Sequence, residues 1–124
     1  MPPSSAPASR SPHSLLPLKP VETLILMMLS AGDRHGYGIR QEILEHSSGT
    51  IELEAAHLYR HIRHLESENL VETPARSRAP AGVDPRRIYY RLTPFGRRVL
   101  AAEMLRLKAL VRLAESRHII PAGA

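Results

Sequence analysis

The chain has 124 residues, enough for one modest domain, and its 43% hydrophobic content supports an aliphatic core, because only 4% of the residues are aromatic. A net charge of +5 favours a polyanionic partner such as nucleic acid. The alternative is a basic protein that has no such partner, and the charge alone does not exclude it. The chain has no cysteine, which excludes a disulfide, a thiolate nucleophile and a cysteine-based zinc site and is typical of cytoplasmic proteins. Its longest apolar run, Leu24 to Leu29, is too short to span a membrane.

The first ordered element is expected to be a helix that begins near Pro20. Residues 1–17 are rich in proline and serine and predict a disordered tail. Proline suits the first position of a helix, and Glu22 suits its first turn. This helix ends at Gly32 and is apolar nearly all round, which indicates that a partner subunit covers one of its sides.

A second helix is expected in the segment HGYGIRQEILEHSSG, which begins at His35 and has a broad apolar side. Ser48 and Gly49 end it, and a short extended piece, residues 50–53, follows.

The third helix, about Glu54 to Asn69, has three distinct faces. Leu58, Ile62 and Leu65 lie between about 80° and 140° from His57 and predict the buried stripe. The face at about 240–300° points directly away from the core and carries Ala56, Arg60, Arg63 and Ser67. His57, His61 and His64 lie on the shoulder between these faces, and Asn69 can adopt the left-handed conformation that ends a helix.

Two strands and a last helix complete the pattern. Residues 70–73 are compatible with a strand, and RIYYRLT (87–93) alternates strictly, so the arginine-rich loop between them predicts the tip of an antiparallel hairpin. Thr93 and Pro94 form a strong helix start, and the helix runs to about His118. Its apolar positions follow 4,3,4,3 spacing, a coiled-coil-like seam. The seam either packs on its own domain or pairs with a second chain, and a helix of roughly 38 Å favours pairing.

This order predicts a mainly α protein with a small β-hairpin wing (α+β): a winged helix-turn-helix with a C-terminal dimerisation helix. The expected boundaries are a tail at 1–17, a DNA-binding domain at 18–92, a dimerisation helix at 93–118 and a flexible tail at 119–124.

At this point the sequence resembles the PadR family of bacterial transcriptional regulators, over about residues 18–117. HGYGI resembles the start of the family's second helix. LYRHIRHLESENLVE resembles its recognition helix, and RRIYYRLTPFGRRVL its passage from wing strand to final helix. Glu54, Ala55, Ala56 and His57 stand where the family often has Ser-Pro-Gly-Thr, so its hydroxyl contacts with phosphate are missing here.

The predicted function is a sequence-specific, DNA-binding repressor that reads a palindromic operator in the major groove, with the wing over the flanking phosphates or minor groove. Residues 54–98 carry nine arginines against five acidic residues, which favours this surface over a merely solvated one. By resemblance, Tyr59 contacts a phosphate. The side chains expected to contact DNA are His35, Tyr37, Ala55, Ala56, His57, Tyr59, Arg60, Arg63, His64, Arg76, Arg78, Arg86 and Arg87.

Useful affinity requires two half-sites, which predicts a homodimer. The expected interface residues are Leu24, Met27, Met28, Leu100, Met104, Leu107, Val111 and Ala114. The resemblance implies a small hydrophobic or phenolic effector near this interface, between the first helix and residues such as Met104 and Lys108.

Other readings remain open. His57, His61 and His64 could bind a metal or sense pH, although no cofactor or metal site is expected without a further ligand. A winged helix used only for protein contacts is a second alternative. An enzyme is not expected, because no phosphate-binding glycine loop or activated nucleophile is present.

Overall fold

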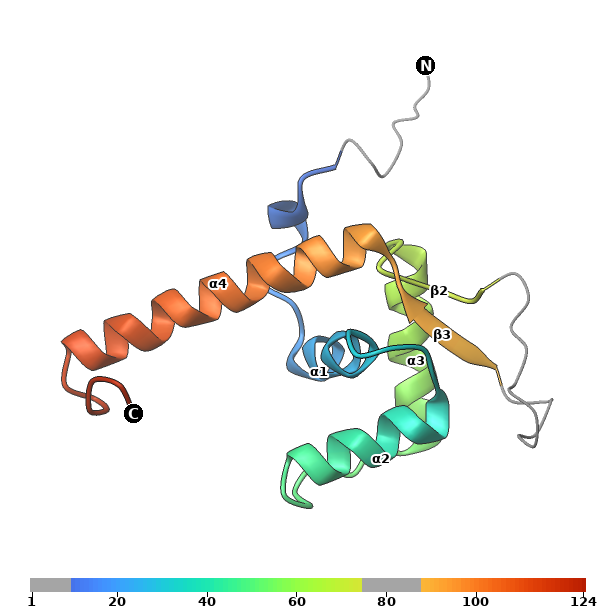
Figure 1. The fold of residues 1–124 in the computed structure, drawn as a ribbon, viewed down its shortest axis with the longest axis horizontal. Helices are drawn as coiled ribbons and strands as arrows, with labels where there is room; N and C mark the ends of the chain where they lie inside the picture. Colours follow the sequence, from blue (N-terminus) through green and yellow to red (C-terminus); the bar gives the residue numbers. More distant parts are fainter. Residues whose placement is uncertain (1–9, 75–87) are drawn as a thin grey trace.

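The computed structural model describes residues 10–74 and 88–124, and its helices pack around a small antiparallel sheet (Figure 1). The described elements, in chain order, are the 3-10 helix η2 (Pro12–Leu15), α1 (Pro20–Leu29), β1 (Arg34–His35), α2 (Gly36–His46), α3 (Ala55–Ser67), β2 (Val71–Glu72), β3 (Tyr89–Leu92) and α4 (Pro94–Ser116). This is the expected mainly helical winged fold. No helix in these two ranges is both long enough and apolar enough to cross a membrane.

The sheet has the strand order β1-β3-β2, with β3 in the middle. The expected hairpin pairs Val71 with Leu92 and Glu72 with Arg91. The sequence did not predict β1, which pairs Arg34 with Tyr90 on the other side of β3. A strand of two residues is too short to produce an alternating pattern, so only its pairing reveals it.

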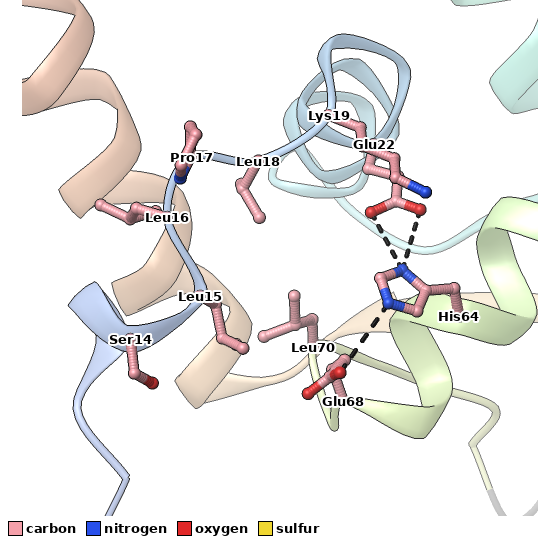
Figure 2. A pocket seen from close by; sticks show the side chains of 10 residues that line it. All are labelled: Ser14, Leu15, Leu16, Pro17, Leu18, Lys19, Glu22, His64, Glu68 and Leu70. Atoms are coloured by element: carbon pink, nitrogen blue, oxygen red, sulfur yellow. Dashed lines mark hydrogen bonds and ion pairs between the residues drawn. The ribbon is translucent and has the colours of Figure 1, made fainter.

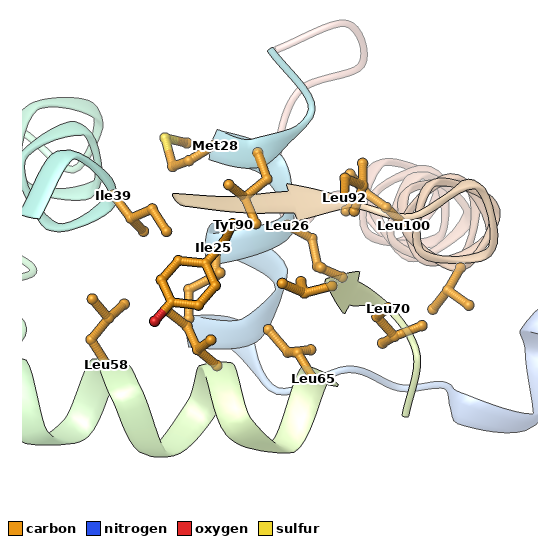
Figure 3. Close-up of a cluster of buried hydrophobic side chains, with 14 of the residues drawn as sticks. Ile25, Leu26, Met28, Ile39, Leu58, Leu65, Leu70, Tyr90, Leu92 and Leu100 are labelled. Carbon is orange, nitrogen blue, oxygen red and sulfur yellow. The ribbon is translucent and has the colours of Figure 1, made fainter. Parts of the chain in front are cut away.

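The core lies between α3, α1 and the sheet (Figure 3). Leu58 and Leu65 point from α3 toward Ile25 and Leu26 of α1, and Tyr90 of β3 fills the space between them. Leu58, Ile62 and Leu65 are no more than 1% exposed, so the predicted buried stripe of α3 is confirmed. This stripe fixes which face of α3 points outward.

The junction between α3 and α4 is closely packed. Asn69 has a φ of 64°, as expected for the residue that ends α3. The Thr93 hydroxyl donates to the Asn69 carbonyl at 2.7 Å and accepts from the Gly96 N–H at 2.8 Å. A side chain at Gly96 would collide with the backbone carbonyl of Leu70, so only glycine fits this contact. The end of α3 and the start of α4 are therefore held together.

Residues 10–17 are ordered and pack on the domain, which differs from the tail expected up to residue 17. Leu15 and Leu16 pack against the core, and η2 contacts α4. Arg10 pairs with the carboxylate of Glu68 at 2.7 Å and also donates to the Glu68 carbonyl. The proline and serine content concealed a short run of leucines that buries enough surface to order the segment. Residues 1–9 lie outside the described part.

Candidate nucleic-acid interface

The outward face of α3 is exposed and basic. Ala55, Ala56, His57, Arg60 and Arg63 are all exposed. Ala56, Arg60 and Arg63 lie on the side of α3 opposite the buried leucine and isoleucine stripe. Neither guanidinium has a hydrogen-bond or ion-pair partner among the residues that the structure describes. Unpaired arginines beside two small alanines form a surface that can approach closely to a polyanion.

The N-terminus of α3 has no side-chain cap. Glu54 occupies the N-cap position, but its carboxylate accepts no hydrogen bond from the first turn. The free N–H groups and the helix dipole favour an anion at this end. The exposed Glu54 carboxylate supplies a negative charge there itself, and it would repel a phosphate that approached the same end.

Tyr59 links α3 to α2. Its ring is half-buried and lies 6.5 Å from the ring of Tyr90, and a side chain at Gly36 would collide with its hydroxyl. Burial, followed by the neighbouring Tyr59, raises the pKa of Tyr90, so the Tyr90 phenol stays neutral at physiological pH. Tyr59 is therefore a packing residue that also reaches the edge of the exposed face.

The two residues expected to contact DNA from the start of α2 differ in their surroundings. His35 is half-buried and caps α2, because its Nδ1 accepts from the Gly38 N–H at 3.0 Å. Its ring also meets that of Tyr89 edge-on at 5.3 Å. Tyr37 is 52% exposed, and its hydroxyl accepts from Gln41. Tyr37 is thus the more accessible of the two.

The three histidines of α3 do not converge. His57 is exposed, with no partner in the described ranges, whereas His61 and His64 turn back toward Glu22 of α1. His64, expected to contact DNA, is about half exposed and lies between Glu22 and Glu68 (Figure 2). Within residues 10–74 and 88–124 no group of three histidine or acidic side chains is arranged to hold a metal.

Glu22 is a buried residue whose contacts with two histidines of α3 the sequence did not predict. It is only 2% exposed, although its position in the first turn of α1 suggested a simple helix-dipole role. The available signal was a carboxylate in a helix that is otherwise apolar on nearly every side. Such a helix is buried, so the carboxylate needed a partner.

The expected wing contacts, Arg76, Arg78, Arg86 and Arg87, lie outside the described residues. The strand that carries the wing back to the domain is described: Arg91 is 48% exposed and lies 3.3 Å from Asp33 and 3.9 Å from Glu72. This arginine is thus engaged with acidic neighbours.

The expected dimer residues divide into two groups along α4. The first part of the seam packs on its own domain: Leu100 is 6% exposed, and Met104 packs against the core. Beyond Glu103 no residue of α4 is buried, and Val111 is 45% exposed. Leu105, Leu110 and Leu113, which the heptad pattern did not include, are also exposed. On α1, Met28 is buried, whereas Leu24 and Met27 are partly buried against the core.

A cavity of about 260 Å³ lies between residues 14–19, the first turn of α1 and the C-terminal end of α3 (Figure 2). Leucines form one wall, and Glu22, His64 and Glu68 form another. None of the residues expected to line an effector pocket, between α1 and α4, borders this cavity.

Known proteins resemble the chain in both sequence and fold. The sequence profile described as the transcriptional regulator PadR-like family matches residues 25–102. A PadR family transcriptional regulator from Eggerthella lenta is 30% identical, with a TM-score of 0.59 over 76% of this chain and 80% of that one. A PadR family regulator from Clostridium difficile is 23% identical, with a TM-score of 0.66 over 77% and 95%. Bacillus subtilis PadR, solved in complex with operator DNA, is 20% identical, with a TM-score of 0.58 over 69% and 47%.

Proposed function

Because the chain belongs to the PadR-like family of transcriptional regulators, we propose that it represses transcription as a homodimer bound to a palindromic operator. The observation that carries this proposal is the exposed face of α3, where Arg60 and Arg63 have no partner in the described ranges. The family consists of transcription regulators and not of enzymes, which agrees with the expected lack of catalytic activity.

In this proposal α3 is the recognition helix and enters the major groove. Arginine donates two parallel hydrogen bonds to a guanine edge, and the small side chains of Ala55 and Ala56 let the helix backbone approach the bases. Bacillus subtilis PadR, which has a similar fold, was solved in complex with operator DNA, and this supports DNA as the partner. We assign the wing arginines, including Arg86 and Arg87, to flanking phosphates or the minor groove.

The C-terminal half of α4 is the proposed dimerisation surface. Leu110, Val111 and Leu113 are between 45% and 49% exposed, on a helix that extends beyond the rest of the domain (Figure 1). Apolar side chains grouped in this way are typical of a surface covered by a second chain. A two-fold dimer presents two recognition helices to the two halves of a palindrome.

A small hydrophobic or phenolic effector is the proposed release signal, bound where α1 and α4 meet the partner subunit. The methionines Met27 and Met104 support this placement, because both lie at the edge of the core and methionine adapts to varied ligands. We also assign the regulator to the cytoplasm, where bacterial DNA lies.

The proposal is tested by replacing Arg60 and Arg63 with alanine, singly and together. Operator affinity is measured by fluorescence anisotropy on DNA from upstream of the protein's own gene. Each single change should weaken binding by about 5- to 150-fold, because a base-reading arginine contributes roughly 1–3 kcal/mol. Arg112→Ala is the matched control, since it removes the same charge from an exposed position on α4.

Stability separates loss of contact from loss of fold. Both arginines are exposed and unpaired in the described part, so the melting temperature should stay within about 2 °C of the wild type. If the double variant binds operator as tightly as Arg112→Ala does, α3 is not the reading helix.

A further inference from the structure

Glu22 ties α1 to the proposed recognition helix through two histidines. Its carboxylate is 2% exposed, and Oε2 lies 2.9 Å from Nδ1 of His61 and 3.0 Å from Nδ1 of His64. Its other oxygen lies 3.1 Å from the same His64 nitrogen (Figure 2). His61 and His64 lie on the shoulder of α3, between its buried stripe and the exposed face that carries Arg60 and Arg63. The contact with Glu22 therefore helps to set the direction in which the arginines point.

Each of these contacts requires a proton on the histidine nitrogen, because an ionised carboxylate only accepts hydrogen bonds. A neutral imidazole supplies that proton when its hydrogen is on Nδ1. A protonated imidazole supplies it together with a positive charge, and a charge-assisted hydrogen bond is roughly twice as strong as a neutral one. Imidazole is also the side chain that ordinarily gains a charge between pH 8 and 5.

Of the other charged groups around Glu22, His61 and His64, some favour a positive charge on the histidines and others oppose it. Glu68, at the end of α3, lies 3.8 Å from Nε2 of His64 and favours its protonated form. Arg10 pairs with Glu68 at 2.7 Å and offsets part of this attraction. Lys19 borders the same cavity and opposes a further positive charge, but its side chain is exposed and therefore screened by solvent. The buried Glu22 carboxylate lies closer to both imidazoles than any of these groups does.

We propose that Glu22 is a positioning residue for operator reading, and that protonation of His61 and His64 strengthens its hold on α3. Operator affinity then increases as the pH falls from 8 to 6. This inference rests on the proposed function, since it concerns the regulation of the same DNA-reading face. It differs from a direct attraction between the half-exposed His64 and a phosphate, because it depends on the Glu22 carboxylate and is lost when that charge is removed.

The test compares operator affinity at pH 6, 7 and 8, at constant ionic strength, in four proteins. Glu22→Gln keeps the shape of the side chain but removes its charge. His64→Arg supplies a cation that does not titrate in this range. His57→Gln is the matched control, because His57 is exposed on the same helix and has no partner in the described ranges. It also reports any direct attraction of an imidazolium for phosphate.

The wild type and His57→Gln should each bind about fivefold more tightly at pH 6 than at pH 8, as expected when neutral hydrogen bonds become charge-assisted. Glu22→Gln should bind weakly, with little change over this range, and the pH response of His64→Arg should be at most half that of the wild type. The proposal is overturned if operator affinity changes as much with pH in Glu22→Gln as in the wild type. It is also overturned if His57→Gln is the one variant in which the pH dependence disappears. If Glu22→Gln does not fold, an undiminished response in His64→Arg overturns it.

Unfolding without DNA separates this inference from the proposed function. In this proposal the contact is stronger when the histidines are protonated, so its contribution to stability should be present at pH 6 and should decline as the pH rises toward 8. The melting temperature of the wild type, relative to that of Glu22→Gln or His64→Arg, should therefore fall over this range. A constant difference overturns the proposed role of Glu22. A protein that binds no operator at any pH, yet shows the pH-dependent difference, overturns the proposed function and leaves the role of Glu22 in holding α3 intact.

Discussion

Glu103 is a buried carboxylate that stabilises the N-terminal segment on α4. It is 1% exposed and accepts from Arg106 through two contacts, from Nε at 2.7 Å and from Nη2 at 2.8 Å. The hydrogen bond with Arg106 lowers the pKa of Glu103 below its ordinary value near 4.5, against the opposing effect of burial, and the backbone N–H of Leu18 lowers it further. One side chain therefore joins α4 to the residues that precede α1.

Replacing Glu103 with glutamine should destabilise the protein by roughly 1–3 kcal/mol at pH 7, because hydrogen bonds to a charged group are lost. A pKa that is lowered in the folded state contributes stability above the ordinary glutamate value. This stability is lost as the pH falls through the lowered pKa, so the difference between wild type and variant should shrink below about pH 4. Urea unfolding at pH 3 to 7 measures it. Glu45→Gln, an exposed carboxylate on α2, is the control, and an equal effect from this control would contradict the argument.

At the scale of single residues, sequence reasoning succeeded where the cause is local. The Thr93 cap and the left-handed Asn69 depend on a few neighbouring residues, and both are present as expected. The partners of His61 and His64 could not be predicted in this way. Glu22 lies 39 and 42 positions earlier in the chain, and only the packing of α1 against α3 brings the three together.

At the scale of elements, the N-terminal end of α3 limits both the stability of that helix and its approach to DNA. Glu54 occupies the N-cap without a capping hydrogen bond from its side chain, and the same exposed carboxylate repels phosphates. Serine at this position accepts a hydrogen bond from the first turn and carries no charge.

Glu54→Ser should therefore raise the free energy of unfolding by about 1 kcal/mol and tighten operator binding by severalfold. Chemical denaturation and anisotropy measure the two effects. Glu52→Ser removes the same charge two residues before the cap, from another exposed position. If Glu52→Ser raises stability as much as Glu54→Ser does, the gain comes from net charge and not from the cap.

The predicted helices agree with the structure because their apolar periodicity is long. Leu58, Ile62 and Leu65 repeat over two turns of α3, and this repeat is enough to identify the exposed face from the sequence. The 3-10 helix η2 and the strand β1 have four and two residues, so neither provides a period. Both are held by tertiary contacts, with α4 and with β3 respectively.

At the scale of the whole molecule, the C-terminal half of α4 carries apolar side chains that are exposed in the single chain. Replacing Leu110 and Val111 together with glutamine removes apolar surface without changing the net charge. We expect a folded monomer at micromolar concentration, with weaker operator binding because only one half-site is held at a time. Analytical ultracentrifugation measures the association.

Leu105→Gln is the matched control on the same helix. Leu105 is 68% exposed but lies about 140° around the helix axis from Leu110. The Leu105→Gln variant should form the proposed dimer and bind operator with the affinity of the wild type. A double variant that also remains a dimer would place the interface on another surface.

The joint at Thr93 has a consequence for the operators that this protein accepts. One hydroxyl bonds both the carbonyl of the residue after α3 and the first turn of α4, and so holds the proposed recognition helix and the proposed dimerisation helix in one relative orientation. Each base pair inserted between half-sites rotates the second half-site by about 35° around the duplex axis. In the proposed dimer the two recognition helices cannot rotate to follow this change. The number of base pairs between the half-sites should therefore affect operator affinity nearly as strongly as the base sequence does.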